Sequence, residues 1–147
     1  MKALKGFTIF AAGGLCYGIV EILWRGSTHI SMFIVGGLCF YIIGQLDEHR
    51  HSFCLIGQAA ISSLVITAIE FSSGVIINIA LDLNVWDYSR LPMNVLGQIC
   101  LPFSILWLLL SVPAIYFEDC LRHCLFGEPM KKISLLPRLK SRSTAEI

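Results

Sequence analysis

Two glutamates inside apolar stretches are the residues of this chain best placed to do chemistry. Glu21 and Glu70 each lie within a long hydrophobic run, and a polar and aromatic segment, WDYSRLPMNVLGQIC, occupies residues 86–100. An ionised carboxylate at the centre of a bilayer costs at least ~2.5 to 3.5 kcal/mol on insertion scales, so it persists there only with a partner or a role. Two such carboxylates suit a cation or an amine-bearing solute.

The positions of these residues along the chain place them at a similar depth. At a rise of 1.5 Å per residue, Glu21 lies roughly 21 Å and Glu70 roughly 25 Å from the cytoplasmic edge of a hydrocarbon core of about 30 Å. Gln98, counted from the other side, lies about 5 Å below the outer surface. The sequence therefore predicts a polar layer in the outer half of the membrane, with the segment that begins at Trp86 directly above it.

Helical spacing predicts that the polar residues face inward together. Small and polar residues of the third apolar stretch recur at steps of three and four, which is one face of a helix. These residues are Ser63, Thr67, Glu70, Gly74 and Asn78. Arg25 follows Glu21 by one helical turn and can pair with it, while Asn94 and Gln98 are placed on the start of the fourth helix. The predicted binding residues are Glu21, Arg25, Glu70, Asn78, Trp86, Asp87, Tyr88, Asn94 and Gln98.

Each of these residues, considered alone, also has a purely structural explanation. A Glu21–Arg25 pair can simply lock the bundle, and Trp86 and Tyr88 are typical of an interfacial aromatic belt. The coincidence of all of them at one depth favours a functional pocket. The sequence contains no Ser-His-Asp set, HExxH, nucleophile elbow or Walker A motif, so no catalytic residue is assigned. The enzymatic alternative acts on a lipid headgroup, with Glu70 or Asp87 as general base.

The composition predicts the elements that carry these residues. Hydrophobic residues make up 56% of the 147 residues and charged residues only 14%, whereas a soluble domain has roughly 25% charged residues. Four apolar stretches, 7–24, 30–46, 53–80 and 95–117, are close to or above the ~17 to 25 residues that span a bilayer as a helix. We therefore expect an all-α protein with a four-helix transmembrane domain over residues 1–126. Residues 127–147 are expected to form a short, basic, mobile cytoplasmic tail.

The basic residues predict the orientation. Nine of the eleven Lys and Arg residues fall on one side of the predicted spans, and basic residues near helix ends are held in the cytoplasm. Both termini and the turn at 47–51 are thus expected to be cytoplasmic, and residues 26–29 and 83–94 to face outward from the cell membrane. The tail is expected to attract anionic membrane lipid. A net charge of +1 without a basic, aromatic-interleaved patch argues against nucleic acid as a partner.

The six cysteines do not predict a disulfide framework or a cofactor. Cys120 and Cys124 are one helical turn apart with His123 beside them, which could hold a metal. These three groups are an incomplete tetrahedral set, and a reducing compartment explains free thiols without a metal. We therefore assign no metal and no cofactor.

Several of these motifs resemble those of a known family. EFSSG at 70–74, the 86–100 segment, Trp107 and YGIVEILW at 17–24 are similar to the Putative ABC-transporter type IV family of small membrane proteins, which includes animal transmembrane proteins of unknown role. The likeness covers about residues 10–120 and implies a four-helix, permease-like protein. Because the chain lacks nucleotide-binding motifs, ATP-driven transport would require a separate ATPase subunit.

The sequence as a whole favours a membrane-embedded binding or translocation component of unknown substrate. The alternatives are the lipid-headgroup enzyme and a structural or accessory subunit of a membrane complex, in which the polar layer only specifies helix pairing. Four short helices make a thin wall for a pore, so a homo-oligomer is also expected.

Overall fold

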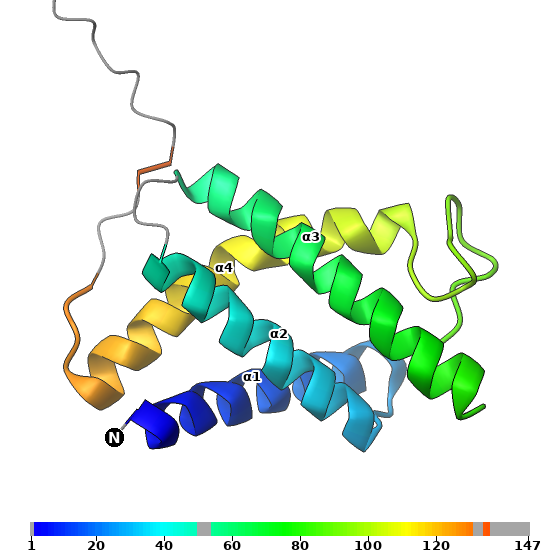
Figure 1. Cartoon of the computed structure of the whole chain (residues 1–147), viewed down its shortest axis with the longest axis horizontal. Helices are drawn as coiled ribbons and strands as arrows, with labels where there is room; N and C mark the ends of the chain where they lie inside the picture. The colour runs from blue at the N-terminus through cyan, green and yellow to red at the C-terminus, as the bar shows by residue number, and fades with distance from the viewer. Residues whose placement is uncertain (1, 50–53, 131–133, 136–147) are drawn as a thin grey trace, which may run out of the picture.

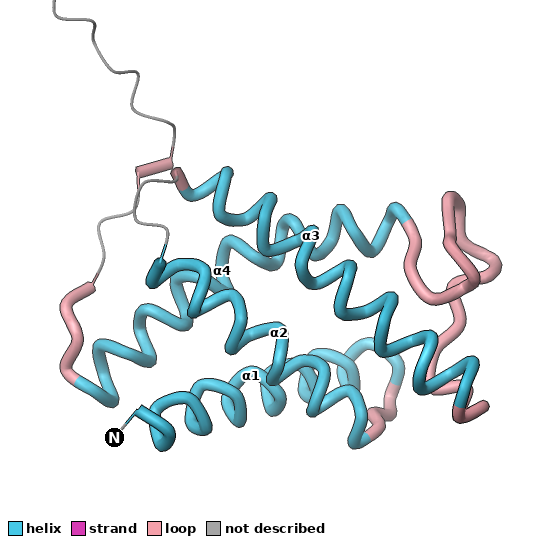
Figure 2. The backbone as a smooth tube through the Cα atoms, in the orientation of Figure 1, coloured by secondary structure: helices cyan, strands magenta, loops and turns pink. Residues whose placement is uncertain are grey.

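Four α-helices build the described part of the chain, which is residues 2–49, 54–130 and 134–135 of a computed structural model (Figure 1). In chain order they are α1 Lys2–Arg25, α2 Ile30–His49, α3 Leu55–Gly74 and α4 Leu101–Phe126, and a π-helical segment, η1 Val75–Ala80, continues α3. The described residues consist of helices and their connecting loops and contain no β-strand (Figure 2). The prediction of an all-α membrane bundle is confirmed.

Three of the helical segments are long and apolar enough to cross a membrane. They are Lys2–Arg25, Leu55–Ala80 and Leu101–Phe126, of 24, 26 and 26 residues. A segment of 26 residues is about 39 Å long, which exceeds a hydrocarbon core of about 30 Å. The apolar part of α2, Ile30–Leu46, is shorter and coincides with the predicted second stretch.

The fourth helix differs from the prediction at both ends. It begins at Leu101 instead of residue 95, because Leu96 and Gly97 have φ angles of +51° and +68° that no α-helix accommodates. Pro102 lies in the first turn of the helix, where a backbone N–H would have no partner within the helix, so its missing N–H costs no hydrogen bond. The helix ends at Phe126 instead of residue 117, at a left-handed Gly127 cap. The residues from 118 to 126, which lie beyond the predicted fourth stretch, are thus the last turns of α4.

The second helix and the tail also differ from, or fall outside, the prediction. The α2 helix continues to His49, so residues 47–49 of the predicted turn are helical, and residues 50–53 lie outside the described part. The predicted tail, 127–147, is described only at 127–130 and 134–135. There the Ser134 carbonyl accepts a hydrogen bond of 2.8 Å from the Leu55 N–H, at the start of α3.

Glycines allow α1 and α2 to lie side by side as a hairpin (Figure 1). A Cβ at Gly13 would collide with the Phe40 side chain, and a Cβ at Gly36 would collide with Tyr17. Such close approach through small residues is typical of membrane helices. The centre of the bundle is apolar, with a core of Val35, Cys39, Ile43, Leu55, Ile66 and Ile115.

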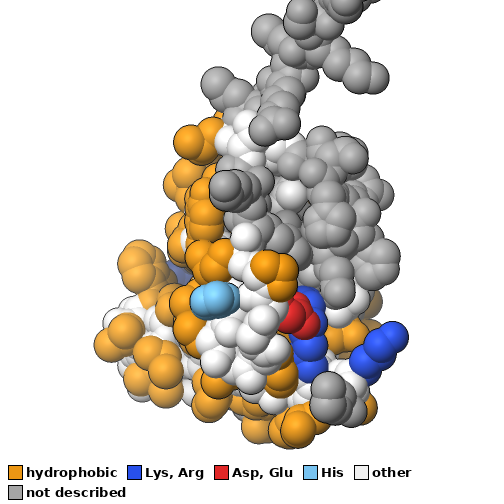
Figure 3. Space-filling view, turned by 90° about the vertical axis from the view of Figure 1, so that its left-hand side faces the viewer, with side chains coloured by type: hydrophobic (Ala, Val, Ile, Leu, Met, Phe, Trp, Pro, Cys, Tyr) orange, Lys and Arg blue, Asp and Glu red, His pale blue; other side chains and the backbone are white. Residues whose placement is uncertain are grey.

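Hydrophobic side chains also cover much of the molecular surface, as expected where lipid replaces water (Figure 3). Leu23 and Trp24 are each 81% exposed and Leu64 is 72% exposed. We call the end of the bundle that carries residues 26–29 and the 81–100 loop the loop end. The opposite end, where α1 begins and α4 ends, is the terminus end (Figure 1).

Candidate functional site

Glu70 of α3 is buried between the loop and α4. Its Oε1 accepts a hydrogen bond of 3.0 Å from the Tyr88 hydroxyl, and its Oε2 accepts one of 2.7 Å from the Trp107 indole N–H. The residue is only 3% exposed. Tyr88 stacks on Phe103 with ring centroids 4.6 Å apart, and Trp107 stacks on Tyr17 of α1 at 5.9 Å. One carboxylate thus connects two aromatic pairs from three elements.

The predicted inward stripe of α3 faces α4 and the loop. Ser63 donates a hydrogen bond of 2.9 Å to the Ser104 carbonyl, and Thr67 donates one of 3.3 Å to the Ser104 hydroxyl. Gly74 lies against Gln98 and Trp86. The spacing argument therefore identified the correct face of this helix.

Asn78 and Gln98 hold the loop through their amides. Asn78 donates to Gln98 Oε1 at 2.8 Å and to the Trp86 carbonyl at 3.0 Å, and it accepts from the Val85 N–H at 2.7 Å. The Trp86 indole in turn donates to the Gln98 carbonyl at 3.0 Å. Gln98 lies in the loop and not on the fourth helix, which corrects the prediction. Its position in the loop, together with the π-helical turn that carries Asn78, lets the two amides meet.

Asp87 and Asn94 shape the tip of the loop instead of joining Glu70. Asp87 accepts hydrogen bonds of 2.8 and 2.9 Å from the N–H and hydroxyl of Ser89, and these bonds lower the pKa of the exposed Asp87 carboxyl. Asn94, predicted to be helical, instead donates to the Ser89 and Leu91 carbonyls. A lowered pKa makes Asp87 a weaker general base, which counts against it in the enzymatic alternative.

Glu21 and Arg25 form the predicted ion pair at the loop end of α1. Arg25 Nη2 lies 2.5 Å from Glu21 Oε1, and the Thr28 hydroxyl donates to Glu21 Oε2. Arg25 also donates a hydrogen bond of 2.7 Å to the Val85 carbonyl. The pair therefore ties α1 to the same loop residue that Asn78 holds through its N–H.

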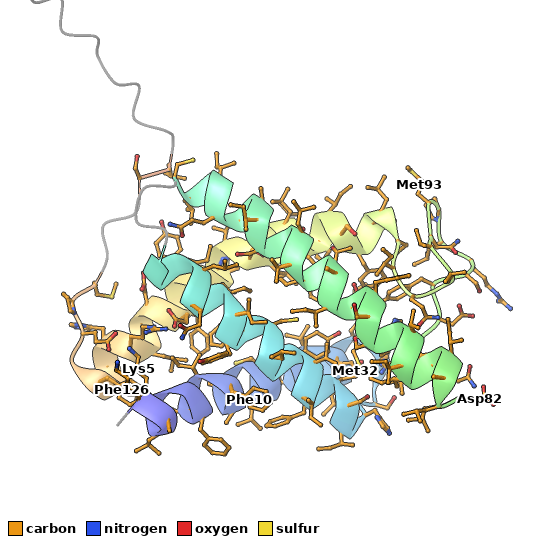
Figure 4. The ribbon with its side chains drawn as sticks, viewed as in Figure 1. Lys5, Phe10, Met32, Asp82, Met93 and Phe126 are labelled. Atoms are coloured by element: carbon orange, nitrogen blue, oxygen red, sulfur yellow. The ribbon has the colours of Figure 1, made fainter. Side chains whose placement is uncertain are left out.

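Most of the predicted residues are joined at the loop end, but not as one cluster of carboxylates. Glu21 has Arg25 as its partner, whereas Glu70 has two neutral donors, and the loop connects the two groups. We call this set the loop-end network; its members are Glu21, Arg25, Glu70, Asn78, Trp86, Tyr88, Gln98 and Trp107. Asp82 and Met93 lie at this same end of the molecule, away from Lys5 and Phe126 at the terminus end (Figure 4).

A charged cluster at the terminus end was missed by the sequence interpretation. Glu118, Asp119 and Arg122 of α4 are 0%, 4% and 2% exposed, and Glu118 pairs with Arg122. Glu128 lies 3.7 Å from Arg122 and also pairs with Lys5 of α1, whose hydrogen bond lowers the pKa of the Glu128 carboxyl. Acidic and basic side chains meet at this end of the bundle (Figure 3). The available signal was the spacing of four residues between Glu118 and Arg122.

The cysteine and histidine group of α4 is not assembled as a metal site. Cys120 and Cys124 are exposed with their sulfur atoms 3.9 Å apart, but His123 Nδ1 lies 2.7 Å from the Glu128 carbonyl instead. The part of the chain that the structure describes has no group of three His, Cys, Asp or Glu side chains arranged to hold a metal.

Gly74 gives a test of how tightly the loop packs on α3. A Cβ at this position would lie 2.5 Å from Gln98 Oε1 and 3.1 Å from the Trp86 ring. We expect Gly74→Ala to lower the free energy of unfolding by about 1–3 kcal/mol, because the buried amide must move. The measurement is an SDS unfolding titration of the purified protein in micelles.

Gly18→Ala is the matched control for Gly74→Ala. At Gly18 a Cβ would meet only the Thr28 hydroxyl, at 3.9 Å, so the substitution should be neutral or stabilise the helix by roughly 0.5–1 kcal/mol. Equal effects of the two substitutions would contradict the close packing of the loop on α3.

Comparison with known proteins agrees with these motifs. The family model described as Putative ABC-transporter type IV matches residues 7–134, which include all four helices except the first residues of α1. Searches of curated proteins and of solved structures found no match. The match covers most of the chain and the whole loop-end network. The chain therefore belongs to the Putative ABC-transporter type IV family.

Proposed function

We propose that this protein is the membrane-embedded binding or translocation component of a transport system, and that Glu70 binds a cationic solute. The observation that carries the proposal is the Glu70 carboxylate, which is 3% exposed and accepts hydrogen bonds from two neutral donors. Ionisable groups within membrane helices mark substrate and ion pathways in many transporters. The transporter-type family supports the same interpretation.

A cation is the solute class that the charges favour. Arg25 is committed to Glu21 and to the Val85 carbonyl, and Arg122 lies in the charged cluster of the terminus end. Neither guanidinium forms an ion pair with Glu70. A sodium ion, a potassium ion or a protonated amine can supply the positive charge that the described side chains do not supply.

The 81–100 loop is the element that would cover this site. Tyr88 belongs to the loop and bonds Glu70 directly, while Trp86 and Gln98 anchor the loop to η1 through Asn78. A solute that enters from the loop end must displace the Tyr88 hydroxyl from Glu70 Oε1. The Walker A motif is absent from the sequence, so ATP-driven movement would depend on a separate ATPase subunit.

One observation favours an accessory subunit as the second candidate. The polar groups of the loop-end network hydrogen-bond one another, including both oxygens of Glu70 and three contacts of the Asn78 amide. In this candidate the network has a purely structural role, which is to fix the loop on the helices. In that case the loop would be a docking element for a partner in a larger membrane complex.

Cation uptake by vesicles tests the proposal. Proteoliposomes that contain the purified chain are expected to accumulate radiolabelled sodium, rubidium or methylammonium faster than protein-free vesicles under an imposed membrane potential or an acid-inside pH gradient. No uptake of any of the three probes, together with recovery of a stoichiometric partner in mild detergent, would favour the accessory subunit. The critical variant is Glu70→Gln, which is argued in the Discussion.

The orientation of the bundle is a separate prediction. With the loop outside and both termini in the cytoplasm, a Met93→Cys variant on a cysteine-free background should react with an impermeant maleimide in intact cells. A Met130→Cys variant should react only after the membrane is permeabilised. Both side chains are well exposed, at 74% and 54%, so access depends on the side of the membrane. The reverse labelling pattern would show that the bundle is inserted the other way round.

A further inference from the structure

Glu70 differs from Glu21 in the charge of its partners. Glu21 has the Arg25 guanidinium 2.5 Å away. Among the described residues, no Lys, Arg or His forms an ion pair with Glu70, whose partners are the Tyr88 hydroxyl and the Trp107 indole. An ionised Glu70 therefore lacks a compensating charge in a buried position within a membrane helix, where an unpaired charge costs the most free energy.

The titratable groups around Glu70 do not change this conclusion. The α1 helix contributes Tyr17 and, beyond it, the Glu21–Arg25 pair, and α2 contributes Cys39. The loop contributes Tyr88, with Cys100 close to its hydroxyl. Trp107, the α4 residue that bonds Glu70, is not titratable. A phenol or thiol side chain carries no positive charge in either protonation state, so none of these tyrosines and cysteines compensates an ionised Glu70.

The hydrogen-bond geometry provides a place for a proton. An indole N–H can only donate, so Oε2 must remain an acceptor for Trp107. A phenol hydroxyl both donates and accepts, so a proton on Oε1 can point at the Tyr88 oxygen once the hydroxyl rotates. The neutral acid can thus keep both neighbours, and a proton needs no additional volume in this buried position.

We propose that Glu70 carries a proton while the site is empty and exchanges it for the cation that it binds. The exchange is balanced: the carboxylic acid and a monovalent cation give the carboxylate–cation pair and a proton. The proton leaves to the aqueous phase from which the cation enters. The buried site is electrically neutral before and after the exchange. This inference rests on the proposed function and assigns the transported solute to monovalent cations moved against protons.

Infrared difference spectroscopy tests the proton without requiring transport. The purified protein in lipid, without added sodium, potassium or amine, should show the carbonyl band of a protonated carboxyl that is lost as the pH is raised. Glu70→Gln should remove this band, while Glu21→Gln should retain it, because Glu21 has the Arg25 guanidinium as its partner and Glu70 does not. Absence of the band in the wild type, or its loss in Glu21→Gln alone, would overturn the proposal.

Proton release measures the exchange itself. In weakly buffered lipid vesicles with a pH indicator, adding sodium or methylammonium chloride should release one proton per bound cation from the wild type and none from Glu70→Gln. Cation uptake without proton release would refute the exchange while leaving the transport function standing. The infrared band without any uptake of the probes would refute the transport function while leaving the proton site standing.

Discussion

The Glu70→Gln variant is expected to insert and fold normally yet lose cation uptake. Glutamine keeps nearly the same volume; its carbonyl can accept from the Trp107 N–H, and its NH2 can donate to the Tyr88 oxygen once that hydroxyl rotates. The substitution should therefore cost no more than about 0.5–1.5 kcal/mol of stability. The loss of a buried charge that pairs with the solute costs about 2–5 kcal/mol of binding, which is roughly thirtyfold or more in affinity. Uptake by proteoliposomes and an SDS unfolding titration measure the two effects separately.

Two comparisons make the Glu70→Gln result decisive. Asp82→Asn removes an exposed carboxylate at the same end of the molecule, at a φ of +51° that asparagine tolerates, and it should leave uptake unchanged. Glu70→Ala is less informative, because it leaves the Trp107 N–H and the Tyr88 hydroxyl without their acceptor. If Glu70→Gln retains uptake at normal expression, the charge is dispensable and the accessory-subunit candidate becomes the better one.

The helices could be predicted from the sequence because apolar length and composition determine them. The first three apolar stretches agree with α1, α2 and α3 with η1. The start of α4 could not be predicted in the same way. Residues 95–99 are mostly apolar, but the Val95 N–H bonds the Ile99 carbonyl across a tight turn with positive φ at Leu96 and Gly97. An apolar run does not distinguish such a turn from a helix.

The candidate site could be predicted as a set of residues but not as a set of contacts. Helical periodicity identified the inward face of α3 and the Glu21–Arg25 pair, since both depend on neighbours three or four residues away. The partners of Glu70 lie 18 and 37 residues away. They depend on how the loop folds back on the bundle, which no local spacing determines. The sequence argument therefore grouped Asp87 and Asn94 with Glu70, although the structure places them at the tip.

The charged cluster was missed because the predicted fourth stretch ended at residue 117. Once α4 continues to Phe126, the same residues turn inward, where Gly44 of α2 leaves room for the Glu118 side chain. A Cβ at Gly44 would collide with that carboxylate. Ion pairs at the two ends of the bundle thus differ in burial: the Glu21 and Arg25 side chains are 10% and 32% exposed, and those of Glu118 and Arg122 are 1% and 3% exposed.

This difference in burial leads to the second large prediction, which concerns Arg122. Removing one partner of a buried ion pair leaves an uncompensated charge, at a cost of about 3–5 kcal/mol. We expect Arg122→Ala to lower the free energy of unfolding by that amount, because the Glu118 carboxylate stays buried against α2 and loses the Arg122 guanidinium, while Glu128 keeps its pair with Lys5 of α1. SDS unfolding titrations of the purified protein measure the change.

Arg25→Ala provides the matched comparison for Arg122→Ala. It also removes the arginine of a Glu–Arg pair spaced by four residues, but its side chain is 32% exposed, so the loss should be near 0–1 kcal/mol for the pair itself. The Glu118→Ala, Arg122→Ala double variant should be more stable than the sum of the two single losses predicts, since the second substitution removes an interaction that the first has already broken. Equal losses for Arg25→Ala and Arg122→Ala, or strict additivity in the double variant, would show that the charged cluster is solvated and does not hold α4 to the rest of the bundle.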